Sequence, residues 1–462
     1  MVEGIGISMF IPLFMTLGIN KIPDGETELM FYNVLEYLSI EDSLFLILFI
    51  IGILFITKGI LTFIHGGYTG YLLSDLAKKL KEQIFIAYCE VDYCHFIKRN
   101  SGHYMNVFNQ QANYFALSFN RFSNFISSFV MAIFYFTLSF FMAWRFALMA
   151  IIVGVVFLVL FRHLNELMRK LSLKSTSEES HVNNLLIQAL HGFKYIASTN
   201  QSNHLKKGVF QSTRRLKNYG FQSWLGASIT SAVREPILIL TIIALIMVQV
   251  VLFEGAVSTI IVVILIFHRT INTAVSIQTN WQGLMSMMGS VEIVNNELKT
   301  MKEKKDLSGS HSIHALRKSI ELKDISFGYD EKRTSVLKGV SVLIPVNKTI
   351  AFVGESGAGK STLVDLLTLL LKPQSGNIYI DGVNTKDVEN ISWRDQIGYV
   401  SQETIIFDDT IANNICMWQG DNTSDPDLMR RIKTVARESN IEDYVDSLPA
   451  GFQTIVGDKG VL

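Results

Sequence analysis

Long apolar stretches constrain this fold more than any other feature of the sequence. Residues 43–65 read SLFLILFIIGILFITKGILTFIH, which as a helix rising 1.5 Å per residue is long enough to cross a hydrocarbon core of about 30 Å. Further apolar stretches are found at 122–143, 146–161, 236–253 and 257–280, and a weaker one at 5–19. The first 300 residues therefore predict an all-α transmembrane domain of six helices.

Short connections join some of these stretches. Trp144 and Arg145 alone separate 122–143 from 146–161, which predicts a tight turn between two membrane spans, and residues 254–256 separate the last two stretches in the same way. A secretory signal is the alternative for 5–19, but such a signal needs a basic beginning and a small-residue cleavage site. This sequence opens with Met-Val-Glu and contains Pro12, so we expect it to begin inside a first membrane helix.

Lysine and arginine residues gather in two long loops, 66–120 and 163–220, whereas the opposite loops carry only Lys21 and Arg145. Because basic loops stay on the cytosolic side, the two long loops are predicted to be cytosolic. Their mixed polar and apolar pattern and few prolines predict two long helical hairpins that extend beyond the membrane. We expect a multi-pass integral protein of the cell's inner or plasma membrane.

Charged residues make up 13% of residues 1–300 and 26% of residues 301–462, so an apolar domain precedes a water-soluble one. The charged segment 301–318, with Ser and Gly at its centre, is predicted to be the linker. The domains are thus expected at 1–300 and 319–462. The 41 basic and 41 acidic side chains cancel, which argues against a nucleic-acid partner bound through bulk charge.

A glycine-rich loop follows the linker. The pattern predicts strands at 320–327, 336–344 and 349–353, and a helix at 361–371. Between the last two lies the motif G-x-x-x-x-G-K-[ST], whose glycines let the backbone fold around phosphate while the next helix presents its positive end. The residues predicted to bind ATP here are Gly354, Glu355, Ser356, Gly357, Ala358, Gly359, Lys360, Ser361 and Thr362. Lys360 should bridge the β- and γ-phosphates, and Ser361 should ligate Mg²⁺.

The sequence around this loop resembles the nucleotide-binding domain of ABC transporters, and the whole chain is similar to their exporter type. Ser326-Phe327-Gly328-Tyr329 resembles the A-loop, which implies that Tyr329 stacks on adenine. Residues 399–402, Tyr-Val-Ser-Gln, with 406–411 after them, resemble the Q-loop, which implies that Gln402 contacts Mg²⁺. The resemblance thus implies an α/β P-loop ATPase fold, with ATP and Mg²⁺ as cofactors.

The resemblance covers only the first part of such a domain. Residues 454–460 are similar to the segment just before the family's signature sequence, and the sequence stops at Leu462. The signature loop, the Walker B carboxylates and the switch histidine should follow, so no catalytic residue is assigned here and ATPase activity is expected of a longer parent protein. The family also implies coupling helices near 92–100 and 193–200, which dock on nucleotide-binding domains.

Three cations, Lys58, Arg234 and Arg269, are predicted to lie within the membrane. Such residues are candidates for function, although ion pairing with Glu3 and Glu235 and snorkelling to the cytosolic surface explain them equally well. If one lines a cavity, it could hold an anionic headgroup. The first span and these cations resemble PglK-type flippases of lipid-linked oligosaccharides, but Lys58 stands where an arginine is expected, which weakens bidentate recognition.

The favoured hypothesis is a subunit of an ATP-driven exporter or flippase that moves a lipid-linked or amphipathic substrate outward across the lipid bilayer. By resemblance, its partner is a second half-transporter, and a homodimer is expected because C₂ pairing is the commonest assembly. Three alternatives stay open at this point: a multidrug or peptide exporter, a non-transporting ATP-binding membrane regulator, and a membrane-tethered P-loop kinase.

Overall fold

The computed structural model describes residues 44–253, 257–330, 335–402 and 405–457, together with Gly6, Met9, Phe10 and Leu13. These residues form two compact units: the first comprises residues up to Leu307 together with the short segment at Tyr329 and Asp330, and the second comprises the other residues from Ser308 onward. The expected bounds of the two domains and the linker stay a prediction. The stretch 5–19 lies almost entirely outside the described residues.

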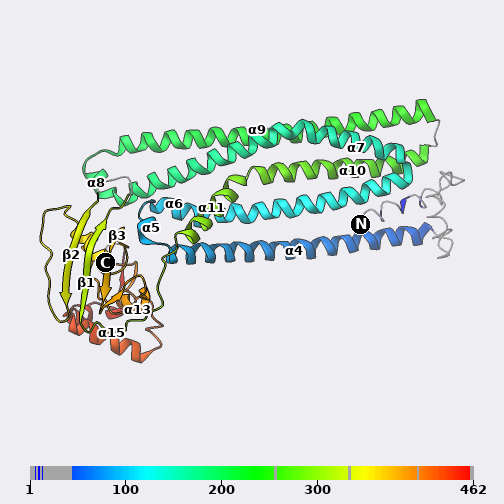
Figure 1. The fold of residues 1–462 in the computed structure, drawn as a ribbon. Helices are drawn as coiled ribbons and strands as arrows, with labels where there is room; N and C mark the ends of the chain where they lie inside the picture. The colour runs from blue at the N-terminus through cyan, green and yellow to red at the C-terminus, as the bar shows by residue number, and fades with distance from the viewer. Residues whose placement is uncertain are drawn as a thin grey trace. The chain divides into compact units, whose positions relative to one another are not determined.

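The first unit is built from helices, most of them long (Figure 1). They are α4 (Leu44–Glu90), α5 (Tyr93–Phe96), α6 (Ser101–Asn106), the π-helix η1 (Val107–Gln111), α7 (Ala112–His191), α8 (Phe193–Ser198), α9 (Ser202–Phe253), α10 (Val257–Met285) and α11 (Met288–Glu303). The short helices α5 and α8 lie within 92–100 and 193–200, the two segments expected to be coupling helices at the tips of the cytosolic hairpins.

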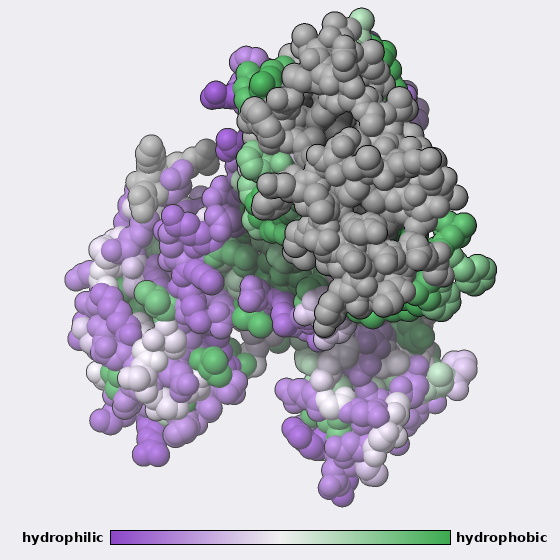
Figure 2. All heavy atoms as spheres, turned by 90° about the vertical axis from the view of Figure 1, so that its right-hand side faces the viewer, coloured by the Kyte–Doolittle hydropathy of each residue, from purple (hydrophilic) through white to green (hydrophobic). Residues whose placement is uncertain are grey.

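Apolar side chains cover the outside of α4. Phe45 is 86% exposed and Phe63 82% exposed, and hydrophobic atoms are visible on the flanks of this unit in Figure 2. Among the residues searched, Leu44–Glu90 and Ser101–Phe140 are helical stretches long and apolar enough to cross a membrane. The helices α4 and α9 also continue well beyond their apolar parts, as the sequence predicts for helices that leave the membrane.

Helix α7 folds back on itself, although its residues are helical throughout. Gln111 Nε2 donates to Glu179 Oε2 at 3.3 Å, and Asn106 Nδ2 donates to Ser180 Oγ at 2.6 Å. A straight helix would separate residues 111 and 179 by about 100 Å, so the chain must reverse between them. The midpoints of the two pairs, 145 and 143, place the reversal where the sequence predicts a turn, and Figure 1 shows the ribbon turning back.

Buried polar pairs hold the folded α7 against its neighbours. Asn165 and Gln278 exchange amide hydrogen bonds of 3.4 and 3.0 Å, with Gln278 fully buried. Thr230 Oγ1 donates to Gln282 Oε1 at 2.8 Å, which joins α9 to α10. Asn165 belongs to the stretch 163–220 that is predicted to be cytosolic, so these bonds join the helices at and beyond the predicted membrane surface, where a buried amide without a partner would be costly.

Replacing Gln278 with Ala should weaken this packing. The change leaves the buried amide of Asn165 without its partner and should lower the free energy of unfolding by about 1–2 kcal/mol. Thermal unfolding of the full-length protein in detergent measures the effect. Thr279→Ala, at the next, exposed position, is the matched control, and a Gln278→Ala protein as stable as this control would contradict the role of the pair.

The second unit begins with an antiparallel sheet of order β2-β1-β3-β4. The strands are β1 (Ser319–Phe327), β2 (Leu337–Pro345), β3 (Ser375–Ile380) and β4 (Val383–Asn384), so the predictions for 320–327 and 336–344 are confirmed. Asp381, just after β3, accepts the backbone N–H groups of residues 317–319 at 2.6–3.0 Å. Partial burial raises the pKa of Asp381, but these three bonds outweigh it and lower the pKa, which fixes β1 beside β3.

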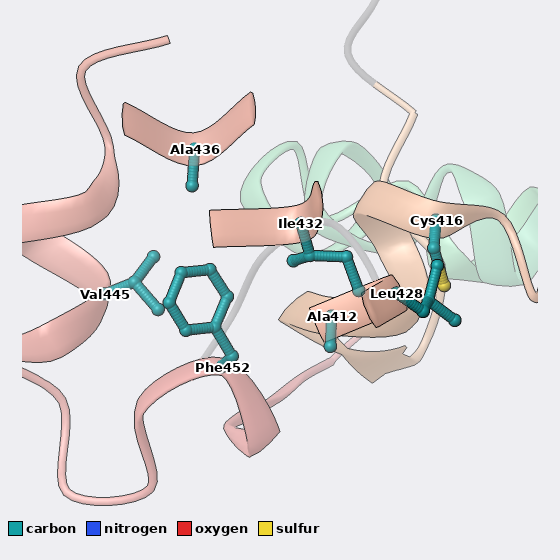
Figure 3. Packing of buried hydrophobic residues seen from close by; sticks show 7 residues of the cluster. All are labelled: Ala412, Cys416, Leu428, Ile432, Ala436, Val445 and Phe452. Atoms are coloured by element: carbon teal, nitrogen blue, oxygen red, sulfur yellow. The ribbon is translucent and has the colours of Figure 1, made fainter. Parts of the chain in front are cut away.

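Small helices and a two-stranded sheet complete this unit. They are α12 (Lys360–Leu367), α13 (Asn390–Arg394), α14 (Ile411–Cys416), α15 (Pro426–Glu438), α16 (Glu442–Asp446), η2 (Gly451–Gln453), β5 (Asp409–Thr410) and β6 (Ile455–Val456). Asp425 caps α15 by accepting two backbone N–H bonds, with Pro426 at the first helical position, a favoured start. Figure 3 shows Phe452 packed beside Val445, in a core that includes Ile432.

Two expectations differ from the structure. Residues 349–353 form no strand, and Val353 is 93% exposed, because neither described sheet offers this run a neighbouring strand for pairing. The helix expected at 361–371 ends at Leu367. Leu369 has a φ of +56°, and the N–H groups of Leu370 and Leu371 both bond to Asp365 O, which closes the helix early.

Candidate functional site: the phosphate loop and a polar membrane cavity

The glycine-rich motif forms an irregular loop that leads directly into α12. Gly357 has a φ of +87° and Gly359 a φ of +88°, left-handed values that favour glycine. A Cβ on Gly359 would lie 2.8 Å from Leu337 Cδ2 and 3.1 Å from Val336 Cγ1. The loop is therefore held close to the start of β2, and a larger residue at 359 has no room.

Lys360 folds back over this loop. Its Nζ donates to Gly354 O at 2.9 Å and to Glu355 O at 2.8 Å, so the ammonium group spans the curve of the backbone. The first N–H groups of a helix have no partner within it and carry partial positive charge. The ammonium group and the start of α12 therefore offer positive charge from two sources to an anion held by the loop.

The remaining loop residues divide by exposure. Glu355, Ser356, Ala358 and Ser361 are exposed or half-exposed, whereas Thr362 is 5% exposed and packs into the unit. The Ser361 hydroxyl is thus accessible to a metal ion carried by phosphates. Thr362 has a packing role in addition to any role in nucleotide binding.

Tyr329 and Gln402, the other predicted nucleotide contacts, lie on different segments. Tyr329 follows two residues after the end of β1, and Gln402 is an exposed residue in a stretch without regular structure. Their roles at adenine and at Mg²⁺ stay predictions.

The segment after Gln402 is tied down by a network that the sequence analysis missed. Asp409 accepts hydrogen bonds from Asn413 Nδ2 at 2.9 Å, Trp418 Nε1 at 2.7 Å and Thr410 N at 2.6 Å. The bond from Asn413, then those from Trp418 and Thr410, lower the pKa of Asp409. The Trp418 ring also meets Phe407 edge-on at 5.0 Å, so α14 fixes the path of residues 407–410.

The residues of the loop fit a bound nucleoside triphosphate. A lysine ammonium, a helix start and left-handed glycines are what phosphate binding requires. Within the described part of the chain there is no group of three or more His, Cys, Asp or Glu that could hold a metal ion by itself. Mg²⁺ usually reaches such sites together with the phosphates and keeps several of its waters, and its contacts with Ser361 and Gln402 stay predictions.

Two family models match the chain. The model described as ABC transporter transmembrane region matches residues 3–275, and the model described as ABC transporter matches residues 337–457. The first alone covers more than half of the sequence. The chain belongs to the ABC transporters. It is therefore a membrane protein with an ATP-binding domain, and the resemblance read from the sequence is confirmed.

Known proteins agree with this assignment. The heterocyst differentiation ATP-binding protein HepA of a Nostoc species is 25% identical over 86% of this chain, and an ATP-dependent lipid A-core flippase of Pectobacterium atrosepticum is 25% identical over 71%. The match spans 64% of the first relative and 56% of the second. A bacterial Atm1-family ABC exporter solved with ATP bound has the same fold, with a TM-score of 0.77 at 18% identity over 99% of this chain and 79% of that one.

The three predicted membrane cations have different surroundings. Lys58 is half-buried, with its Nζ 5.8 Å from the centre of the Phe55 ring. The side chain of Arg234 lies outside what the structure describes, and Glu3 lies outside the described residues. Arg269 lines a cavity of about 500 Å³ between α7 and α10, so the structure brings it together with polar residues that the sequence analysis did not single out.

A buried carboxylate supports the hairpin tip around α5. Glu297 of α11 is 3% exposed and accepts hydrogen bonds from Arg99 and, at 3.0 Å, from His103 Nε2. Burial raises the pKa of Glu297, but the His103 and Arg99 interactions outweigh it and hold the pKa below its ordinary value of 4.5. This cluster fixes the segment expected to contact a nucleotide-binding domain.

Gly359→Ala should weaken ATP binding about tenfold or more, because the new Cβ meets Leu337 and a left-handed alanine costs about 1–3 kcal/mol. Binding of a fluorescent ATP analogue to the full-length protein measures this. Gly382→Ala is the matched control, because Gly382 has a φ of +89° and a Cβ added there would meet nothing within 4 Å. Equal affinities of the two variants would show that the tight approach at Gly359 does not shape the loop.

Glu297→Gln should destabilise the protein by about 1–3 kcal/mol at pH 7. Because the folded-state pKa of Glu297 is lowered, its stabilising effect is fully present above about pH 4.5 and is lost as pH falls through that lower pKa. Thermal unfolding of the variant and of wild type should therefore converge in acid. Glu303→Gln, whose side chain is 61% exposed, serves as control, and a gap that does not narrow at all as the pH falls below 4.5 would contradict this account.

Proposed function

We propose that the full-length protein is an ATP-driven exporter that moves a lipid-linked or amphipathic substrate outward across the membrane. The observation that carries this proposal is a phosphate loop of binding-competent geometry in one chain with an exporter-type membrane domain. One membrane domain and one ATP-binding domain correspond to half of such a transporter, so the proposed assembly is a dimer of two copies. Residues 1–300 and 319–462 would be its two domains, joined by 301–318.

The relatives support a lipid-linked substrate. Several of them carry the name ATP-dependent lipid A-core flippase, at 25–38% identity over part of this chain. The polar surroundings of Arg269 also support an anionic headgroup. In this proposal Lys58, Arg234 and Arg269 attract that headgroup, Tyr329 stacks on adenine, and Ser361 and Gln402 hold Mg²⁺.

The phosphate loop would hold ATP, and the segments connected to it would respond to the bound nucleotide. Lys360 and the start of α12 would hold the phosphates of ATP, and hydrolysis of the β–γ phosphoanhydride bond by water, which gives ADP and phosphate, would supply the free energy. The hydrogen-bonded segment 407–410 after Gln402 would pass a change at the nucleotide to the rest of the ATP-binding domain. The Glu297 cluster keeps the α5 tip in shape, so that a movement reaching the tip is transmitted to α4 and α6.

Replacing the three membrane cations should remove the response to substrate. In proteoliposomes, we expect a diphosphate-linked glycolipid to stimulate ATP hydrolysis by the full-length protein. The combined change Lys58→Gln, Arg234→Gln and Arg269→Gln should abolish that stimulation, because each cation attracts the headgroup. The matched control replaces three exposed cations of α9 with Gln, namely Lys206, Lys207 and Arg214, and should keep the stimulation.

The outcomes separate the remaining alternatives. ATP binding without hydrolysis would reject the exporter and favour a regulator. Hydrolysis stimulated by peptides or apolar drugs, with no response to glycolipid, would keep the exporter but reject the lipid-linked substrate. Phosphate transfer to a second molecule rather than to water would indicate a kinase.

A further inference from the structure

A second cavity, of about 560 Å³ and mainly apolar, lies between α10 and the two limbs of the folded α7. The limb before the reversal contributes Phe125 and Phe129, the limb after it contributes Val159, and α10 contributes Ile277 and Trp281. The Phe125 and Trp281 rings lie 5.2 Å apart. Sites for small molecules usually measure about 300–1,000 Å³ and have such an apolar lining. Three helical segments thus enclose a space that fits part of an apolar molecule.

This apolar cavity uses other helix faces than the polar cavity beside Arg269. Ser276 lines the polar cavity and Ile277 lines the apolar one, and adjacent residues point about 100° apart around a helix. Asn124 and Phe125 of α7 are divided between the two cavities in the same way. A ligand of the apolar cavity is therefore distinct from a substrate held beside Arg269.

The lining of the apolar cavity changes from apolar to charged along its length. Val159 and Phe129 lie within two of the predicted membrane spans, whereas Arg162 comes directly after such a span and Glu166 belongs to a stretch predicted to be cytosolic. Trp281 follows the last predicted span, at the depth where aromatic residues are enriched. The cavity thus runs from an apolar end in the membrane to a charged end at the predicted cytosolic surface.

Three of the described residues that line the cavity are charged, and one of them is already neutralised. Arg169 donates to Glu292 Oε1 from Nε at 3.1 Å and from a terminal nitrogen at 2.6 Å. Arg162 Nε and Glu166 Oε1 are only loosely paired, at 3.9 Å, with side chains 79% and 58% exposed, and such an exposed pair is weak. A ligand can therefore replace this pairing with its own contacts to one guanidinium group and one carboxylate.

The order of these groups corresponds to that of a phospholipid with a zwitterionic headgroup. Glu166 comes four residues after Arg162, about 6 Å further toward the cytosol along the helix. Phosphatidylethanolamine has acyl chains in the membrane, a phosphate at its surface and an ammonium group beyond the phosphate. A guanidinium group binds phosphate oxygens, and a carboxylate accepts the N–H bonds of an ammonium group. The quaternary ammonium of phosphatidylcholine has no N–H to donate, so Glu166 would distinguish the two lipids.

We propose that the apolar cavity binds phosphatidylethanolamine of the inner leaflet as a resident lipid. An acyl chain lies between Phe129, Val159 and Ile277, the phosphate meets Arg162, and the ammonium group donates to Glu166. The lipid fills the space between three helical segments at the point where they leave the membrane. This inference goes beyond the proposed function, because the lipid is bound as part of the structure and is not the transported substrate.

Photolabelling of the full-length protein tests the site without ATP. The protein is placed in phosphatidylcholine vesicles that contain a small fraction of a probe, either phosphatidylethanolamine or phosphatidylcholine with the same diazirine-bearing acyl chain. Mass spectrometry then locates the labelled peptides. We expect label on residues 125–129 and 277–285, about two- to fivefold more from the ethanolamine probe. Glu166→Gln should remove this preference, whereas Arg162→Gln should reduce labelling by both probes about fivefold and keep the preference.

Lys78 and Glu82 of α4 supply matched controls. They too are four residues apart, with charged atoms at 3.7 Å and side chains 71% and 56% exposed, and neither is among the described residues that line the cavity. Lys78→Gln and Glu82→Gln should leave labelling and preference unchanged. Val159→Trp places a large ring in the cavity and should lower labelling by both probes, whereas Ile56→Trp, at an α4 position that is likewise 65% exposed, should not.

Each outcome decides the inference. Equal labelling by the two probes, a preference that survives Glu166→Gln, or label on other segments only would overturn it. Loss of label in Arg269→Gln would overturn it as well, because the lipid would then occupy the polar cavity. The expected labelling in a protein that moves no substrate would reject the proposed function and leave this inference standing.

Discussion

The helical unit depends on the hydrogen bonds that hold η1 against the later part of α7, and α7 against α10. Gln111, Glu179 and Asn165 all belong to stretches that are predicted to be cytosolic, so these contacts act at and beyond the predicted membrane surface. The bond from Gln111 to Glu179 and the exchange between Asn165 and Gln278 are directional, so they fix which residues lie opposite. Once this register is set, α7 and α10 lie side by side, and the cavity that Arg269 lines falls between them.

The ATP-binding unit depends on a different constraint, which is the position of the phosphate loop against the sheet. Asp381 fixes β1 beside β3, β2 pairs with β1, and Gly359 sits tightly against the first residues of β2. The contacts of Asp381 with backbone N–H groups are short-range and directional, so they fix the strand with which β2 pairs. Both units thus owe part of their order to specific polar contacts.

The membrane helices and the phosphate loop could be predicted from the sequence, because the patterns that indicate them are local. Apolar length gives the membrane helices, the turn at Trp144 and Arg145 separates two long runs, and the motif from Gly354 to Thr362 requires its own backbone shape. The features that could not be predicted depend on contacts between distant parts of the sequence. Residues 349–353 have the pattern of a strand, but a strand exists only where it pairs with another strand. Asn272 and Ser276 line the cavity beside Arg269 only because α7 lies opposite them. Their regular spacing was present in the sequence, yet spacing on one helix cannot reveal its neighbour.

The close approach of Gly359 to Val336 and Leu337 has an effect on the nucleotide site that no phosphate contact would reveal. The side chain of Leu337 is buried at the beginning of β2 and forms the wall against which the loop rests. A change in its volume would shift the backbone that carries Lys360. We therefore expect the affinity for ATP to depend in part on an aliphatic side chain of the sheet, which acts as a spacer behind the loop.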